Sequence, residues 1–228
     1  MKKILLTSAL ALATVTGASA DHMGHTGFYV GLHGGYATGE FESTFIDNNN
    51  PPVFLARTAS GTDGALGGIH LGYDHQVMEM FVIGLEGMFD IGADKHENAD
   101  GTLGTTNTDE IKRKNSYGAA VRLGLAMDQW LPFLKLGWKN SKFEYSRPIN
   151  PANFRIRKER SNAFVVGLGI DYNMNGIMIG AGYEANFYKK EKLLPVSTAA
   201  PQGVNDLGVN STFRPRIHEF KIRLGYKF

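Results

Sequence analysis

The sequence has 228 residues, with 24 basic and 22 acidic side chains and no cysteine. Without cysteine the protein has neither disulfides nor thiol chemistry, and the near balance of charge argues against a nucleic-acid-binding protein, which would present a net basic field. Beyond the first twenty residues no stretch approaches about 18 consecutive apolar residues, so the sequence predicts no transmembrane helix.

The first twenty residues, MKKILLTSALALATVTGASA, have the pattern of an export signal. Lys2 and Lys3 form its positive start, a short apolar stretch follows, and the small residues ASA fit a cleavage site. We therefore expect residues 1–20 to be a cleaved signal peptide and residues 21–228 to form one mature domain, with a formal charge of zero once both lysines are lost. An uncleaved membrane anchor is the alternative, but the apolar stretch is too short to span a bilayer.

Alternation of apolar and polar residues predicts eight β-strands in the mature chain. They cover about residues 27–39, 64–74, 81–92, 115–128, 131–145, 161–172, 177–188 and 215–228. Each is long enough for a tilted strand to cross a bilayer. One face of these strands is apolar and the other carries the charges, which favours a membrane barrel with lipid outside and a polar lumen over a soluble barrel with an apolar lumen.

The predicted connections alternate in length along the chain. Three are short, at residues 75–80, 129–130 and 173–176; four are long, at residues 40–63, 93–114, 146–160 and 189–214. This alternation is typical of outer-membrane barrels, which have tight periplasmic turns and larger external loops. The sequence therefore predicts an all-β, eight-stranded antiparallel transmembrane barrel with three short periplasmic turns and four long external loops.

The opening GFYVGLHGGY, the glycine-rich alternating strands and the terminal YKF resemble the eight-stranded outer-membrane barrels of the OmpA-like and opacity-protein class. The resemblance implies a monomer in the outer membrane of a Gram-negative bacterium, in contact with membrane lipid and lipopolysaccharide. It also implies that Leu224, Tyr226 and Phe228 form the signal read by the barrel-assembly machinery.

Charged residues on the polar strand faces are expected to point into the lumen: Glu86, Arg122, Lys135, Lys139, Asp171, Glu184, Glu219, Lys221 and Arg223. An eight-stranded barrel has room inside for side chains and little else. We interpret this set as a network of ion pairs that plugs the barrel, with an ion path that opens when the pairs rearrange as the alternative. Glycines beside these residues leave volume for them, and His33 and His70 are expected to join the plug.

A basic cluster lies in the third predicted loop and consists of Arg147, Arg155, Arg157, Lys158 and Arg160. Arginine and lysine bind phosphate through charge-assisted hydrogen bonds. We expect this cluster to meet the phosphates of lipopolysaccharide beside the barrel rim. Binding of a host polyanion or of an acidic protein surface is the alternative.

Other candidate chemistry is weaker. Residues 21–25 could bind copper through the new amino terminus and its histidines, but we interpret them as a solvated tail. Enzymes on this fold need a Ser/His pair with an acid, and His218 with Ser161 or Ser146 is the nearest arrangement. We predict no enzyme, no cofactor and no metal site.

Two functions are consistent with this sequence, and a third is less favoured. The first is a structural surface protein that supports envelope integrity. The second is an adhesin or immune-evasion factor that binds host surface molecules through its long loops. The third is a small-solute porin. The sequence contains no feature that names a ligand.

Overall fold

The computed structural model describes residues 24–47, 53–92, 95–99, 108–150, 153–189, 191–193 and 209–228. Its strands are β1 (Gly27–Asp47), β2 (Val53–Gln76), β3 (Phe81–Gly92), β4 (Lys95–Ala99), β5 (Thr108–Leu125), β6 (Trp130–Asn150), β7 (Asn153–Met174), β8 (Ile177–Tyr188), β9 (Glu191–Leu193) and β10 (Val209–Lys227). In these ranges no helix is long and apolar enough to cross a membrane.

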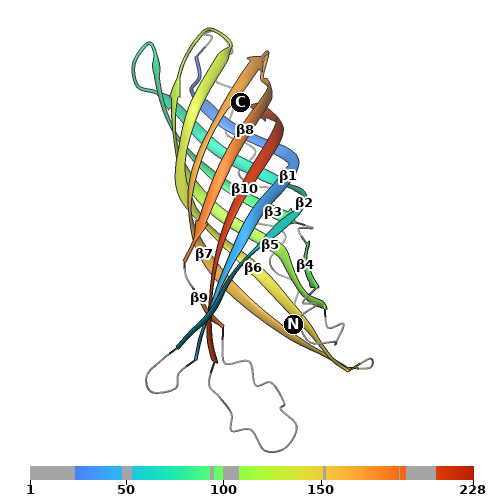
Figure 1. Cartoon of the computed structure of the whole chain (residues 1–228). Coiled ribbons are helices and arrows are strands. Elements are labelled where there is room, and N and C mark those ends of the chain that lie inside the picture. The colour runs from blue at the N-terminus through green and yellow to red at the C-terminus, as the bar shows by residue number, and fades with distance from the viewer. Residues whose placement is uncertain are drawn as a thin grey trace, which may run out of the picture.

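The sheet closes on itself. β1 pairs antiparallel with β2 on one side and with β10 on the other, where Tyr29 lies opposite Lys227. The short strand β4 pairs with β5 and β2 and continues the line of β3, while β9 pairs with β10 next to β8. The ten strands therefore form an eight-stranded antiparallel barrel, as the sequence predicts (Figure 1).

Three short turns lie at one end of the barrel, here called the turn end; the opposite end is the distal end (Figure 1). The turns lie at residues 77–80, 126–129 and 175–176. Asn175 and Gly176 both have positive φ angles, 51° and 85°, which is the conformation of a two-residue hairpin whose twist matches the flanking strands. The short turn predicted within residues 173–176 is confirmed.

The predicted long connections are wrong over much of their length. β1 continues to Asp47 and β2 begins at Val53, so most of 40–63 is strand; β6 and β7 likewise occupy most of 146–160. β4 and β9 lie inside the other two. Towards the distal end the outer face carries charged residues such as Lys142 and Glu144, so the apolar outward pattern ends there although backbone pairing between strands continues.

The outward face carries an apolar band between two rows of aromatic rings. At the turn end the Trp130 and Tyr172 rings lie 4.6 Å apart; towards the distal end the Tyr117 and Trp138 rings lie 5.7 Å apart. Leu134 and Leu136 lie between Trp130 and Trp138 and remain 57% and 46% exposed. Eight residues of strand tilted by about 40° rise about 20 Å. The band therefore has nearly the height of an outer-membrane hydrocarbon layer, with aromatic residues at both interfaces.

Candidate functional site: a charged network in the lumen

Ion pairs fill much of the lumen, and a buried hydrophobic cluster that includes Phe143 and Ile217 lies on the distal side of them. They join six carboxylates to seven bases, contributed by seven of the eight barrel strands: Asp74, Glu86, Asp90, Asp171, Glu184 and Glu219, with Arg113, Arg122, Lys135, Lys139, Lys221, Arg223 and Lys227. Each of these residues is buried. Because burial of an unpaired charge is costly, each charge in the lumen requires a partner of opposite sign.

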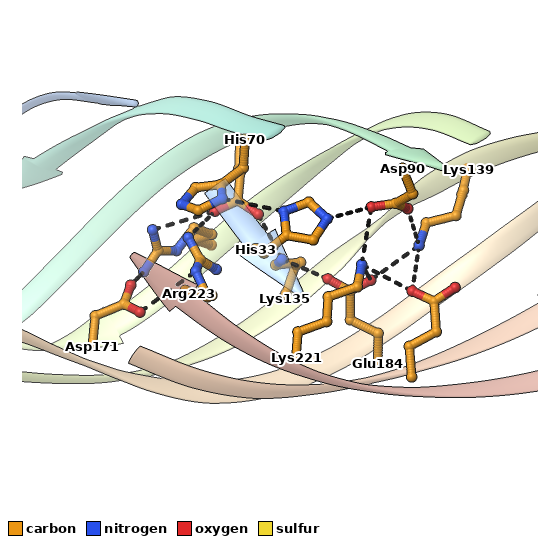
Figure 2. A network of polar contacts seen from close by, with 12 residues as sticks. His33, His70, Asp90, Lys135, Lys139, Asp171, Glu184, Lys221 and Arg223 are labelled. Carbon is orange, nitrogen blue, oxygen red and sulfur yellow. Dashed lines mark hydrogen bonds and ion pairs between the residues drawn. The ribbon is translucent and has the colours of Figure 1, made fainter. Parts of the chain in front are cut away.

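Glu184 on β8 lies at the centre of the network. Its carboxylate accepts hydrogen bonds from Lys135 at 2.7 Å, Lys221 at 2.8 Å and Lys139 at 3.1 Å. These lysines come from β6 and β10, so one carboxylate on β8 connects three strands of the barrel (Figure 2).

Towards the distal end, Lys139 and Lys221 are shared by two further acids. Glu219 lies 2.8 Å from Lys139 and 2.9 Å from Lys221, and it also pairs with Arg113. Asp90 lies 3.0 Å and 3.4 Å from the same two lysines. Each of these two lysines therefore contacts three carboxylates, counting Glu184.

Towards the turn end, Glu86 is the carboxylate that several bases share, as Glu184 is at the centre. It lies 2.6 Å from both Lys135 and Arg223 and accepts a hydrogen bond from the Tyr29 hydroxyl at 2.9 Å. Arg122 pairs with Asp171 at 2.6 Å. Its guanidinium also lies over the Phe133 ring, 4.1 Å from the centroid, a position in which the aromatic face stabilises a cation.

A histidine pair packs beside the network. Nδ1 of His33 lies 3.3 Å from Nδ1 of His70, and Nε2 of His33 lies 2.6 Å from Asp90 (Figure 2). Both histidines point into the lumen, as expected. A Cβ added to Gly31 or Gly68 would lie 2.7 Å from the His70 or His33 ring, so these glycines leave the space that the imidazoles fill.

Little empty space remains between these side chains. A cavity of about 10 Å³ lies beside His70, Lys135 and Arg223. A water molecule needs about that much space for its centre. This part of the lumen is therefore packed with charged and aromatic side chains, without room for a small organic solute.

His25 closes the turn end. It is buried, its backbone N–H donates to Gln76 Oε1 at 3.0 Å, and its Nε2 lies 3.0 Å from the carbonyl oxygen of Asp128. Lys227 Nζ donates to the His25 carbonyl and lies 3.2 Å from Asp74. The predicted solvated tail is therefore wrong for His25, because these contacts fix it; residues 21–23 lie outside the described residues.

Burial, and then the nearby Lys227 ammonium, lower the pKa of His25 below its usual value of 6.5. The fold therefore favours the neutral imidazole, and this contribution to stability holds above about pH 6.5 and falls as the pH drops further. We expect the free energy of unfolding to fall less steeply between pH 7 and pH 5.5 in His25→Gln than in the unmodified protein. Equal pH dependence of urea unfolding for the two proteins would contradict this.

All nine lumen residues that the sequence placed inside lie there and join the network. The sequence prediction omits Asp74, Asp90, Arg113 and Lys227. Asp90 lies on the same face of β3 as Glu86, so the alternation of the sequence is sufficient to place it in the lumen. Arg113 lies beyond a register shift in the pairing of β5 with β6 and before the predicted start of that strand, where the alternation breaks.

Other predicted residues lie elsewhere. Lys158 and Arg160 are exposed on β7. Arg147, Arg155 and Arg157 belong to β6 and β7 rather than to a loop, since the two strands pair up to Asn150; their side chains lie outside those described. The large side chains of the assembly signal, Leu224, Tyr226 and Phe228, are exposed on the outer face.

The candidate pair of Ser161 with His218 does not form. Ser161 is buried on the lumen face of β7, whereas His218 stacks on Tyr183 and lies 2.5 Å from its hydroxyl oxygen. Tyr183 and His218 lie on the outer wall because they share strand faces with Phe187 and Phe220. The barrel wall therefore separates Ser161 from His218. The side chain of Ser146 lies outside the described residues.

A solved structure of an outer membrane protein agrees with this architecture. The outer membrane protein OprG from Pseudomonas aeruginosa is 18% identical, with 91% of this chain and 99% of OprG covered and a TM-score of 0.55. Ail, the attachment invasion locus protein of Yersinia pestis, is 10% identical over 86% of this chain and 99% of its own, with a TM-score of 0.40. The likeness to OprG is one of fold. No curated protein matches the sequence.

The family comparison covers nearly the whole chain. The family model described as the outer membrane protein beta-barrel domain matches residues 7–228. That range includes every strand of the barrel and every charged residue of the lumen network. The chain belongs to this outer-membrane β-barrel family, which places it in the outer membrane of a Gram-negative bacterium.

Proposed function

We propose that this protein is a sealed structural barrel of the outer membrane that supports envelope integrity and does not conduct solutes. The observation that carries the proposal is the continuous lumen network, which runs from Arg113 to Lys227 through shared carboxylates. A solute path would require several of these pairs to separate at once. Each separation leaves buried charges with fewer partners, which is strongly unfavourable.

The purified monomer in a planar lipid bilayer is expected to show no stable channel in neutral salt. In contrast, replacing Lys135, Glu184 and Lys221 together by Ala should remove the centre of the network and produce measurable conductance. This triple variant keeps the local charge nearly balanced and serves as the matched positive control. Large, stable channels from the unmodified monomer would overturn the sealed-barrel proposal.

The envelope role is tested in cells. Deletion of the gene is expected to increase sensitivity to detergents and to large antibiotics, and the unmodified gene should restore resistance. A variant shortened at the distal ends of β6 and β7 should restore it equally well, because the sealed barrel is intact. Unchanged sensitivity after deletion would reject the structural role.

A second candidate is binding of a surface ligand at the distal end, as an adhesin or immune-evasion factor. The observation that favours it is the length of β6 and β7, which continue as a pair about twelve residues beyond Trp138. Replacing Arg155, Arg157, Lys158 and Arg160 with Ser should weaken attachment of cells to host surfaces, more so at low salt, because exposed charges are screened as salt rises. Unchanged attachment would reject this candidate.

A further inference from the structure

A patch of basic side chains covers the outer wall of β5, β6 and β7 near the distal end. It consists of Lys112, Lys114, Lys142, Lys158 and Arg160. Register brings them together: Lys112 lies opposite Glu144, Glu144 opposite Lys158, and Lys142 opposite Arg160. The three strands are neighbours in the barrel (Figure 1). Five basic side chains thus lie around Glu144 on a single face.

Glu144 neutralises only part of this charge. Its carboxylate lies 3.4 Å from Lys158, 3.6 Å from Lys114 and 3.9 Å from Lys142, and those lysine side chains remain 57%, 48% and 32% exposed. Ion pairs as exposed as these are weak. A ligand with more negative charge than one carboxylate can therefore recruit the same lysines.

Arg160 is held in place by its neighbours. Its Nη1 donates to Asn140 Oδ1 at 2.8 Å, and its guanidinium lies over the Tyr117 ring, 5.2 Å from the centroid. Asn162 accepts from Asn140 at 2.8 Å and from the Trp138 indole at 3.1 Å. These contacts orient the arginine, and its side chain remains exposed on the outer wall.

The height of the patch on the wall indicates the ligand. Trp138 and Tyr117 mark the distal aromatic row, with Leu136 and Val121 of the apolar band next to them on the turn-end side. The basic patch lies immediately on the distal side of that row. Aromatic girdles lie at the membrane–water interface, so the patch faces the level of lipid headgroups rather than free solution.

We infer that this patch binds the phosphate groups of an outer-leaflet glycolipid of the lipid A type. The phosphates contact Arg160, Lys142 and Lys114. The acyl chains continue along the apolar wall on the turn-end side of Trp138. Arginine and lysine side chains form charge-assisted hydrogen bonds with phosphate. The inference is independent of the lumen and of the proposed sealed barrel.

The test uses the full barrel refolded into phosphatidylcholine vesicles that contain dansyl-labelled diphosphoryl lipid A. A Trp130→Phe background leaves Trp138 as the sole tryptophan, so energy transfer reports lipid at the patch. Combined Lys114→Gln, Lys142→Gln and Arg160→Gln is expected to weaken apparent binding about tenfold, because each basic residue at a membrane surface contributes to anionic lipid attraction. Glu144→Gln, which removes the competing carboxylate, should strengthen binding.

Matched controls separate this site from general charge attraction. Lys189→Gln, Arg214→Gln and Arg216→Gln remove the same number of exposed cations outside the patch, and they should leave energy transfer unchanged. Lipid A without phosphates should show no preference for the unmodified protein. Equal loss in the patch and control variants, or equal transfer to the phosphate-free lipid, would overturn the inference. Resistance of the folded band to heating on gels confirms that each variant has folded.

Discussion

Glu184→Gln is expected to lower the free energy of unfolding by about 3–5 kcal/mol, since it removes one charge from a buried network and leaves its partners poorly paired. The amide has nearly the shape of the carboxylate, so packing is conserved. Lys135, Lys139 and Lys221, which contact this carboxylate at 2.7–3.1 Å, all lose its negative charge, and the amide nitrogen cannot accept a hydrogen bond from them. Entry of water would reduce the loss. Equilibrium urea unfolding in phosphatidylcholine vesicles measures it.

The outer wall offers a matched control. Glu144 also contacts three lysines, but they are partly exposed, and exposed ion pairs contribute little to stability. Glu144→Gln should therefore leave unfolding in the same lipid almost unchanged. If the two substitutions had equal effects, burial would not be the source of the stabilisation by the lumen network.

Leu224→Arg is expected to destabilise the barrel by about 2–4 kcal/mol in a bilayer, because an arginine on the lipid face near the midplane is costly. Leu224 lies on β10 and is 56% exposed on the outer wall, whereas its neighbour Arg223 is 4% exposed. The penalty comes from the lipid. We therefore expect a smaller loss in detergent micelles, where the charged group reaches water more easily.

Leu224→Ala separates lost apolar contact from the cost of the charge. It should have a much smaller effect than Leu224→Arg in the same vesicles. A cysteine at position 224 should resist water-soluble thiol reagents in intact vesicles. Rapid labelling there, or an arginine substitution without cost, would show that the outward face of β10 is not in lipid.

The alternation in the sequence is sufficient to predict which way most side chains face. Because the side-chain period of a strand is two, the assignment of Arg223 to the lumen and Leu224 to the outside required only their order in the chain. The pairing of charges within the lumen has no such local signal. That Lys135 lies between Glu86 and Glu184 depends on the tilt and register of strands 49 residues away in either direction.

Local irregularities explain the remaining differences. The lumen position of Arg113 is not predicted, because the register shift between Arg113 and Ser116 interrupts the alternation of the strand. The sequence does not predict the distal strand bounds because the outer face becomes charged there, as at Lys142 and Glu144, and the apolar outward pattern ends. Burial of His25 depends on Asp128 and Gln76, which are brought to it by two separate turns, and no pattern in its own segment indicates this.

We expect closure between β1 and β10 to come late in folding. Tyr29 pairs with Lys227, so the contact that removes the last open strand edges joins residues almost 200 positions apart. Contacts this remote in sequence are slow to form. Until they form, β1 and β10 each expose unpaired backbone groups that invite association with other chains; if β10 is missing, β8 is exposed in its place. A nascent chain lacking β10 is thus an aggregation hazard, and shielding it in transit is a requirement set by the topology itself.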